Sequence, residues 1–420
     1  MQRSLSDWLR WQESLSSREI DLGLDRVRRV AARLPIEPPP GAVFTVAGTN
    51  GKGSTVACLD RLLRSGGYRT GAYTSPHLVR YNERVHLAGD PVDDAALTGA
   101  FEQIETVRGD MPLTFFEFGT LAALLLFSGA RCDAWILEVG LGGRLDAVNV
   151  IDPDFSLITT VGLDHQDWLG ESIDEIAVEK AGIMRAAAPA FYGDDAPPPA
   201  LVARAVDLGT QLHCFGRNHG IGMSGERWSW RGETVRLGDL HRPAGADDTV
   251  LRNASLAMAA VEQFDMSLLT RENVDSLVAA VRPAGRFQVV AREPQWILDV
   301  AHNPQAAAIL RDRIEALGEP RDTTVVVGML AGKQIDEFAA ALVGIADRWI
   351  VASLAGPRAM AAAGVADRVA RLSARPVEAA ATPVAAFARA LEITPGDGRV
   401  LCCGSFRIVG PAIEWLGLYS

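Results

Sequence analysis

The chain has 420 residues, of which 48% are hydrophobic and 22% charged. This balance is typical of folded globular proteins and excludes wholesale disorder, and the length is sufficient for two or three domains. Acidic residues outnumber Lys and Arg by 52 to 41, giving a net charge of −11, which disfavours non-specific binding to nucleic acid or to an anionic membrane. An anionic ligand must therefore be held by a local arrangement of positive groups.

Five cysteines are scattered along the chain, and none belongs to a CxxC motif. Neither a disulfide framework nor a zinc cluster is indicated, so a reducing compartment is favoured. The N-terminal residues lack the unbroken apolar segment of a signal peptide. The longest apolar run, LAALLLF at 121–127, is far shorter than the roughly 20 residues of a membrane span. We therefore expect a cytoplasmic protein.

From residue 41 onward, short β-branched runs alternate with helical patterns. Strands are predicted for VFTVA (43–47), RTGAYT (69–74), AWILEV (134–139) and SLITTV (156–161), and helices for residues 54–66, 115–127 and 172–184. Continuous apolar runs such as 134–139 are typical of strands buried on both faces. Strands that alternate with helices predict a parallel sheet covered on both sides.

Residues 185–250 interrupt this pattern. The segment APAFYGDDAPPPA (188–200) is rich in loop-forming residues, and RWSWRGETVRLGDL (227–240) has the alternation and glycine turn of a small antiparallel hairpin. Two helical patterns follow, around 249–263 and 270–281.

A second α/β series follows. Its strands are predicted at 286–290, 296–300, 323–329, 348–354, 375–380 and 399–405, separated by helices such as 304–317. These runs again read as buried on both faces. Pro283, Ala284 and Gly285 interrupt the helical period, so we predict two domains, residues 1–282 and 283–420. The predicted class is α/β, with a mostly parallel N-terminal sheet and a small antiparallel addition.

The segment AGTNGKGST (47–55) is the strongest chemical signal. A strand leads into a glycine-rich turn with Lys52, and a helix follows. Backbone N–H groups, a helix N-terminus and a lysine together form a phosphate cradle. Gly53 separates Lys52 from Ser54, unlike the standard P-loop spacing. The alternative is a tight turn with a surface lysine.

Three further residues follow predicted strands: Ser75, Glu138 and His165. Ligands of doubly wound sheets bind at the carboxyl ends of strands, so these side chains could converge around one Mg²⁺ ion beside the Lys52 loop. The alternatives are a solvated strand end and a structural histidine.

In the second half, Asp299, His302 and Asn303 end one strand and open a helix, and Arg286 lies near the domain boundary. Such a group could bind a sugar, a base or a phosphate, or could provide a helix cap and surface ion pairs. Lys180 lies among acids on a predicted helix and reads by itself as a solvated lysine.

These segments carry a family resemblance. The chain resembles bacterial dihydrofolate synthase/folylpolyglutamate synthase, the folate branch of the Mur-ligase-like ATP-dependent amide ligases. The matching segments are DLGLDRV (21–27), TVAGTNGKGST (45–55), YTSPHLVRYNERV (73–85), TFFEFGTLAAL (114–124), ILEVGLGGRLDAVN (136–149), LDHQDWLG (163–170), EKAGI (179–183), PAGRFQ (283–288), LDVAHNP (298–304) and CGSF (403–406).

The resemblance implies an N-terminal P-loop ATPase-like domain and a C-terminal Rossmann-like domain. It implies that Ser75, Glu138 and His165 bind one or two Mg²⁺ ions and that Lys180 is carboxylated by CO₂. Lys52, Lys180, His165 and Glu138 would then be the catalytic group. The residues implied to bind ATP are Thr49, Asn50, Gly51, Lys52, Gly53, Ser54, Asn253, Arg286, Asp299 and His302.

The resemblance also implies a dihydropteroate site. Its residues are Leu22, Gly23, Leu24, Asp25, Thr114, Phe115, Phe116, Glu117, Leu145, Asp146 and Ala147. The rings of Phe115 and Phe116 suit a pterin or aminobenzoate ring, and read equally well as core.

The implied activity is bifunctional. L-glutamate is joined to 7,8-dihydropteroate and to the γ-carboxylate of tetrahydrofolate and its polyglutamates, through an acyl phosphate, with ADP and phosphate released. The expected protein is a monomer without nucleic-acid or membrane partners. The alternatives are a monofunctional folylpolyglutamate synthase, another Mur-type amino-acid ligase, and a non-catalytic nucleotide-binding switch.

Overall fold

The computed structural model describes residues 3–16, 20–243, 246–280, 284–318, 321–356 and 358–419. The described residues form two compact units. The first comprises those within 3–76, 82–163 and 169–280, and the second those within 77–81, 164–168 and 284–419. The predicted boundary between residues 282 and 283 lies outside the described residues and stays a prediction.

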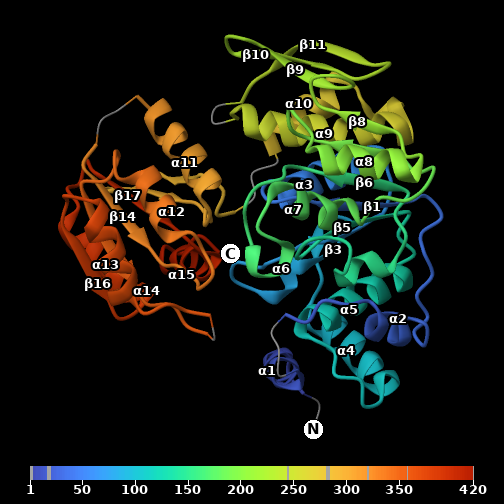
Figure 1. The fold of residues 1–420 in the computed structure, drawn as a ribbon, viewed down its shortest axis with the longest axis horizontal. Helices are drawn as coiled ribbons and strands as arrows, with labels where there is room; N and C mark the ends of the chain where they lie inside the picture. The colour runs from blue at the N-terminus through green and yellow to red at the C-terminus, as the bar shows by residue number, and fades with distance from the viewer. Residues whose placement is uncertain are drawn as a thin grey trace. The chain divides into compact units, whose positions relative to one another are not determined.

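An eight-stranded sheet is the centre of the first unit (Figure 1). In spatial order its strands are β4 (Asp90–Pro91), β3 (Val85–Leu87), β2 (Thr70–Tyr73), β5 (Ala134–Glu138), β1 (Ala42–Ala47), β6 (Phe155–Ile158), β7 (Ala190–Tyr192) and β8 (Leu212–Cys214). The six strands from β2 to β8 in this order run parallel, whereas β3 and β4 are antiparallel additions at one edge. The predicted α/β class with a mostly parallel sheet is confirmed.

Helices cover this sheet. They are α1 (Leu5–Leu15), α2 (Asp25–Ala31), α3 (Lys52–Ser65), α4 (Asp94–Arg108), α5 (Phe115–Gly129), α7 (Ile173–Ala181), α8 (Pro199–Leu208), α9 (Asp248–Asp265) and α10 (Arg271–Ala280), with 3₁₀ turns η1 (Tyr81–Arg84), η2 (Ala147–Val150) and η3 (Met266–Leu268). On one face, α3 and α9 pack against each other and over the central strands. Phe44, Ile136 and Leu157 point into the apolar core on this face, and their burial is the main force that holds the layers together.

Residues 188–214 differ from the sequence-based expectation. The segment expected to be loop-rich contains β7, and α8 and β8 follow it, so the parallel sheet continues through this region. Both strands have only three residues, which is too short for periodicity to identify. The predicted hairpin is confirmed as β10 (Arg227–Arg231) and β11 (Arg236–His241), and β9 (Gly220–Ser224) completes a three-stranded antiparallel sheet.

A buried glutamate holds the turn between β10 and β11. Glu262, on α9, is 8% exposed, and its carboxylate accepts hydrogen bonds from the backbone N–H groups of Glu233, Thr234 and Val235 at 2.6–2.9 Å. Hydrogen bonds to a charged acceptor are among the stronger ones in proteins. The carboxylate therefore fixes the hairpin on α9.

Glu262→Ala should lower the free energy of unfolding by about 3 kcal/mol, because three N–H groups lose a charged acceptor. Urea denaturation followed by tryptophan fluorescence would measure this loss. Glu226→Ala, which removes an exposed acid between β9 and β10 of the same three-stranded sheet, is the control and should change stability by less than about 0.5 kcal/mol. Equal effects of the two substitutions would contradict the anchoring role.

His219 is buried next to this hairpin. Its Nδ1 lies 2.9 Å from Ser255 Oγ, which also accepts a hydrogen bond from Trp230 Nε1 at 3.0 Å. Burial disfavours the charged imidazole and lowers the pKa of His219 to about 4. The side chain is therefore neutral in the folded protein near neutral pH.

A depressed histidine pKa makes stability fall in acid. The unfolded chain takes up the proton at its ordinary pKa of about 6.5, so the contribution is complete above that pH and is lost progressively toward pH 4. Between about pH 7 and pH 5 the loss should be about 2 kcal/mol. His219→Gln should remove this part of the pH dependence in urea titrations at the two pH values. If the variant lost as much free energy of unfolding between the two pH values as the wild type, the acid sensitivity would belong to other groups.

The second unit has a six-stranded sheet. In spatial order its strands are β12 (Gln288–Val290), β13 (Gln295–Leu298), β17 (Arg399–Cys403), β14 (Thr323–Val327), β15 (Arg348–Ala352) and β16 (Val377–Ala380). All run parallel except β12. The reading of every strand as buried on both faces is wrong for the edges: Val289 in β12 is 45% exposed, and β16 is mostly half-buried. Edge strands have a neighbour on one side only, so their side chains remain accessible.

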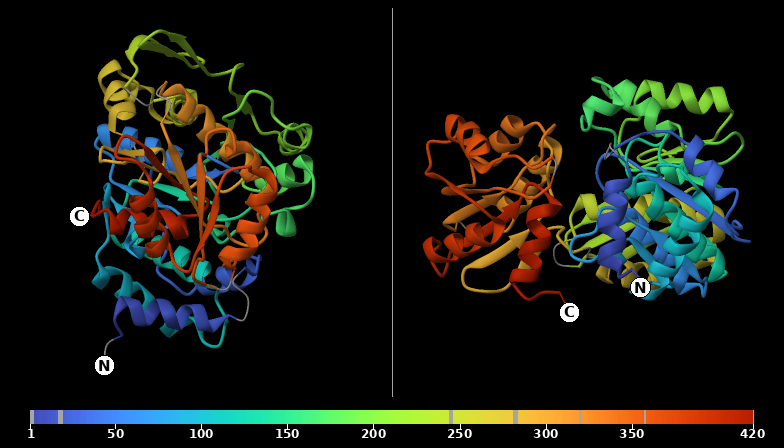
Figure 2. Two further views of the ribbon diagram at one scale, coloured as in Figure 1. Left: turned by 90° about the vertical axis from the view of Figure 1, so that its left-hand side faces the viewer. Right: turned by 90° about the horizontal axis from the view of Figure 1, so that it is seen from below.

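Helices lie on both faces of this second sheet (Figure 2). They are α11 (Pro304–Ala316), α12 (Ile335–Leu342) and α13 (Ala362–Leu372) on one face, and α14 (Pro383–Ile393) and α15 (Phe406–Trp415) on the other. The short α6 (Gln166–Leu169) follows His165 in the chain.

All five cysteines are buried thiols outside any disulfide. Among the described residues, the helices are too short or too polar to cross a membrane.

Candidate functional site

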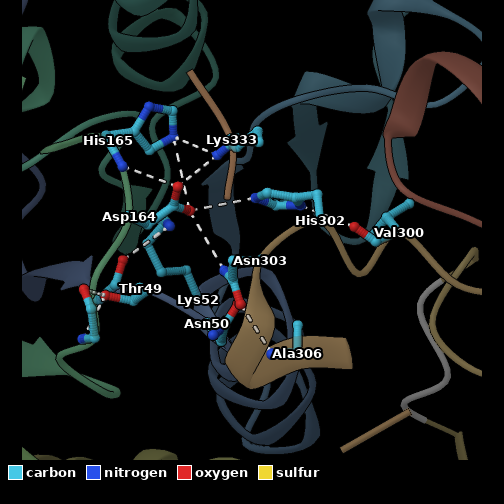
Figure 3. Close-up of polar contacts among 12 residues, drawn as sticks. Thr49, Asn50, Lys52, Asp164, His165, Val300, His302, Asn303, Ala306 and Lys333 are labelled. Atoms are coloured by element: carbon cyan, nitrogen blue, oxygen red, sulfur yellow. Dashed lines mark hydrogen bonds and ion pairs between the residues drawn. The ribbon is translucent and has the colours of Figure 1, made fainter. Parts of the chain in front are cut away.

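The turn from β1 into α3 has the form of an anion cradle (Figure 3). Lys52 is the first residue of α3, and its Nζ donates a hydrogen bond to the Gly48 carbonyl at 3.0 Å. Gly51, at the N-cap, has a φ of +91°, and a Cβ there would collide with the Asn253 carboxamide. Glycine is therefore required at position 51. The turn brings the residues from Thr49 to Ser54 to the α3 N-terminus, next to Asn253.

The residues that follow β6, the strand next to β1, hold the turn between β1 and α3. Asn50 N–H donates to Thr160 Oγ1 at 3.1 Å, and Thr159 Oγ1 donates to the Asn50 carbonyl at 2.6 Å. Thr49 Oγ1 donates to the Gly162 carbonyl at 3.1 Å. Sequence reasoning missed these supporting threonines, although two consecutive threonines close the predicted strand 156–161. They fix the backbone that would face a phosphate.

Glu138 lies over the first turn of α3. It is the last residue of β5, is 4% exposed, and its Oε2 accepts a hydrogen bond from Ser75 N–H at 3.0 Å. A Cβ at Gly53 would lie 3.6 Å from the same oxygen. The first unit thus brings Ser75, Glu138 and the Lys52 turn together at the carboxyl edge of the sheet, where doubly wound folds bind ligands.

His165 belongs to the second unit, where it adjoins an ionic cluster (Figure 3). Asp164 pairs with Lys333 Nζ at 2.5 Å and with His302 Nε2 at 3.4 Å, and accepts a hydrogen bond from Asn303 Nδ2 at 3.4 Å. Burial by itself would raise the pKa of Asp164, but the hydrogen bond to His302 and the charge of Lys333 outweigh it, and the pKa is held far below its usual range. Asp164 is therefore a firmly ionised centre of this cluster.

The other predicted nucleotide residues of the second unit adjoin a turn held by Asp299. Asp299 is 6% exposed, and its carboxylate accepts hydrogen bonds from the N–H groups of Phe287 at 2.8 Å and Ala301 at 2.7 Å. Arg286, next to Phe287, is exposed. Asp299 thus fixes the backbone at Phe287 and at Ala301. The exposed Arg286 guanidinium is accessible to a ligand.

The three predicted dihydropteroate segments meet in the first unit. Gly23 N–H donates to the Leu145 carbonyl at 3.2 Å, joining 22–25 to 145–147. Arg26 pairs with Glu117 at 3.1 Å and with Asp21 at 2.6 Å, joining the first segment to 114–117. Arg26 and Glu117 are 91 positions apart in the chain, and these bonds bring the first segment to the other two. Sequence reasoning left out Arg26, although it lies in the matching segment 21–27.

Phe115 and Phe116, at the start of α5, are only half-buried, whereas Phe118 is fully buried. The Arg84 guanidinium lies 5.4 Å from the centre of the Phe115 ring, and the Tyr73 ring lies 5.8 Å from that of Phe116. Phe115 and Phe116 are therefore not part of the fully buried core.

Asp146 links the pteroate segments to the phosphate turn. It is 2% exposed, and burial raises the pKa of its carboxyl to about 7, against hydrogen bonds from backbone N–H groups, including those of Leu141 and Val148, and against the positive charge of Lys52. Its Oδ2 accepts the Leu141 N–H at 2.8 Å, in the loop that follows Glu138, and Glu138 faces the phosphate turn at Gly53.

Lys180 is buried at the end of α7, with 3% exposure. The reading as a solvated helix lysine is wrong. The loop after Glu138 packs on this end of the helix: Arg144 pairs with Glu179 at 2.8 Å, and Asn149 Nδ2 donates to the Gly182 carbonyl at 3.1 Å. The amine is therefore held in a defined place within the first unit.

Of the predicted site residues, those in the second unit are His165, Arg286, Asp299 and His302, and the remainder belong to the first. Among the described residues, no group of three or more His, Cys, Asp or Glu is arranged to hold a metal ion. The hydroxyl and carboxylate oxygens of Ser75 and Glu138 are the donors that Mg²⁺ prefers, and few protein ligands suffice because the ion keeps waters and binds phosphates. These residues fit a nucleotide-bound Mg²⁺ ion.

Two domain families match the chain. The Mur ligase middle domain matches residues 46–221, and the Mur ligase glutamate ligase domain matches residues 285–406. The dihydrofolate synthase/folylpolyglutamate synthase of Escherichia coli (strain K12) is 40% identical over 410 residues, which cover 98% of this chain and 95% of the relative.

Solved structures agree. E. coli FolC in complex with DHPP and ADP aligns with a TM-score of 0.92 and 39% identity, covering 99% of this chain and 98% of the other. A bifunctional folylpolyglutamate synthase/dihydrofolate synthase with Mn, AMPPNP and L-glutamate bound aligns with a TM-score of 0.90 and 40% identity, with the same coverage. The chain therefore belongs to the dihydrofolate synthase/folylpolyglutamate synthase family of Mur ligases, and is an ATP-dependent amide ligase.

Proposed function

We propose that the chain joins L-glutamate to 7,8-dihydropteroate and to the γ-carboxylate of tetrahydrofolate and its polyglutamates, with ATP converted to ADP and phosphate. Relatives in solved structures carry DHPP with ADP, and Mn with AMPPNP and L-glutamate. These ligands are a pteroate-type acyl group, a nucleotide and the amine substrate, which are the three components that the reaction needs.

One observation carries the proposal: Glu138 faces the phosphate turn at Gly53, and the loop that follows Glu138 is held by Asp146 of the pteroate segments, whose Oδ2 accepts the Leu141 N–H at 2.8 Å. A carboxylate must come within bonding distance of the γ-phosphorus of ATP to be activated. A phosphate turn and pteroate segments that share one edge of one sheet would satisfy this requirement. The position of Asp146 near the phosphate turn, through Leu141 and Glu138, supports acyl phosphate formation at this edge.

In the proposed reaction, the substrate carboxylate attacks the γ-phosphate of ATP and ADP leaves, and the amine of glutamate then displaces phosphate from the acyl phosphate. Lys52 and the N–H groups of 49–54 neutralise charge on the transferring phosphoryl group. Ser75, Glu138 and His165 would hold a Mg²⁺ ion, which would supply further charge neutralisation. Asn253, Arg286, Asp299 and His302 would orient the nucleotide.

We further propose that Lys180 carries a carbamate formed with CO₂. The modification needs an unprotonated amine, and Lys180 is buried, with 3% exposure. A carbamate is an anion, so it would complete the shell around a divalent cation. The loop that follows Glu138 packs beside it, which supports this role.

A product assay tests the function. Dihydropteroate and tetrahydrofolate are supplied separately, each with ATP, Mg²⁺ and L-glutamate, and the products are identified by mass spectrometry. We expect dihydrofolate from the first mixture and an added glutamate in the second. A product in the tetrahydrofolate mixture but not in the dihydropteroate mixture would indicate a monofunctional folylpolyglutamate synthase. ATP hydrolysis without either pterin substrate would favour the nucleotide switch, and glutamate transfer only to a UDP-muramyl substrate would favour another Mur ligase.

Two expectations about context belong to this proposal: a monomeric state and a cytoplasmic location. Light scattering of the purified chain with and without ATP would test the first. Fractionation of the producing cell would test the second.

A further inference from the structure

One guanidinium joins two chain segments of the first unit that are far apart in the sequence. Arg26 Nη1 donates to Asp21 Oδ2 at 2.6 Å, and its Nη2 donates to the Asp21 carbonyl at 2.6 Å. Its Nε and Nη2 also donate to Glu117 Oε1, at 3.2 and 3.1 Å. Donors spread over three nitrogens in one plane are a property of arginine, and an ammonium cannot reproduce them.

The bonds to Asp21 hold together the two ends of residues 22–25. Asp21 precedes this segment and Arg26 follows it, so the guanidinium closes a short loop of chain. Within the loop, the Gly23 N–H donates to the Leu145 carbonyl at 3.2 Å. Among the described residues, no heavy atom beyond its chain neighbours lies within 4 Å of a Cβ built at Gly23, so the backbone here borders open space.

The bonds to Glu117 hold the start of α5. Glu117 Oε2 accepts the Thr114 N–H at 2.7 Å, and Thr114 Oγ1 accepts the Glu117 N–H at 3.2 Å, which is a capping box. Phe115 and Phe116 are the two residues inside this box. Glu117 is 4% exposed, and a buried carboxylate needs a partner of opposite charge. Arg26 is that partner, at the oxygen that the capping box leaves over.

The ring of Phe116 lies beside the loop that leads to the phosphate turn. A Cβ at Gly140 would stand 2.6 Å from Phe116 Cζ, so the ring rests directly on the Gly140 backbone. Gly140 follows Glu138 closely in the chain, and Glu138 faces the phosphate turn at Gly53. A shift of the α5 start would therefore move an aromatic surface relative to the place where phosphoryl transfer is proposed.

We propose that Arg26 is a positioning residue for the acyl substrate: by binding Asp21 and Glu117 together, it sets the spacing between residues 22–25 and the Phe115–Phe116 pair. This inference rests on the proposed function, which assigns both segments to dihydropteroate. Arg26 acts through these segments, and a misplacement of about 1 Å can lower a reaction rate roughly 100-fold.

Steady-state kinetics of the full chain test the positioning role. Dihydropteroate and ATP are varied in turn, with L-glutamate and Mg²⁺ saturating. Arg26→Gln should raise the KM for dihydropteroate roughly 10-fold, because charge-assisted bonds to both segments are lost. The KM for ATP and kcat should stay within about threefold of wild type, because the phosphate turn has separate supports. Arg26→Lys should also raise the KM for dihydropteroate, since it keeps the charge and loses the planar fork.

A matched control and a measurement without substrate separate this role from general stability. Arg29→Gln removes an exposed charge of the same helix and should leave both KM values within about twofold of wild type. Hydrogen–deuterium exchange of Arg26→Gln should be at least about fivefold faster in peptides covering 21–26 and 113–118 than in wild type. Exchange in residues 49–54 should stay unchanged.

A wild-type KM for dihydropteroate in Arg26→Gln would overturn the proposal. An equal rise in both KM values would also overturn it, because the loss would then reflect general unfolding. Failure of the wild-type chain to form dihydrofolate would instead count against the proposed function. The exchange experiment would still decide whether Arg26 holds the two segments, and unchanged exchange in either segment would refute this.

Discussion

Lys52→Gln should reduce ligase turnover at least roughly 10³-fold, the largest effect expected of any single substitution in this chain. Lys52 begins α3 at the phosphate turn, and its amine already donates to the Gly48 carbonyl within that turn. Glutamine keeps the hydrogen-bonding capacity and most of the length but loses the charge that balances the transferring phosphoryl group. Phosphate release coupled to dihydropteroate and glutamate is the measurement.

Arg61→Gln is the matched control, because Arg61 lies on the same helix and donates to Ser276 Oγ at 2.8 Å. It removes one positive charge at a distance from the turn. We expect activity within about threefold of wild type, as for a surface charge in screened solvent. If the two variants lost activity equally, the loss would reflect the stability of α3, and the phosphate role of Lys52 would be refuted.

Lys180→Gln should lower turnover roughly 10²- to 10³-fold, because it removes the amine that we propose to be carboxylated and leaves a neutral side chain in a buried place. The modification has its own signal. Wild-type chain equilibrated with ¹³C-bicarbonate should show a carbamate resonance in its ¹³C spectrum, and Lys180→Gln should lack it.

The scarcity of lysine makes that experiment decisive. Only Lys52 and Lys333 remain in the variant, so Lys333→Gln serves as the comparison and should keep the resonance. A resonance that survived in Lys180→Gln would place the carbamate on another amine. An inactive Lys180→Gln variant without any wild-type resonance would leave Lys180 essential but unmodified.

The features that could be predicted from sequence are local ones. β1, the glycine turn and α3 are contiguous over residues 42–65. The apolar run of the strand, the glycines of the turn and the helical spacing that follows are each unambiguous. The edge strands β12 and β16 were misread as buried, because apolar composition does not reveal whether a strand has one neighbour or two. β7 and β8 are not predicted, because a strand of three residues is too short to show an alternation of apolar and polar residues.

The features that could not be predicted depend on distant parts of the chain. Lys333 and Asp164 are 169 positions apart, and Arg26 and Glu117 are 91 positions apart. Nothing in the local pattern around either member reveals its partner, because folding alone decides which ion pairs form. Lys180 shows the same limit: its helix carries acids at the spacing of a solvated face, and burial is imposed by the loop that packs on it.

The withdrawal of the lysines from solvent changes how the molecule meets reactive chemistry. Primary amines are the usual targets of sugars, aldehydes and activated esters, yet two of the three lysine ε-amines here are buried and the third is half-buried. The outer surface therefore offers its positive charge as guanidinium, which resists acylation. An acyl label on a lysine side chain must therefore have reacted with Lys52, Lys180 or Lys333. The labelling rate of the two buried lysines thus measures how often the structure around them exposes the amine.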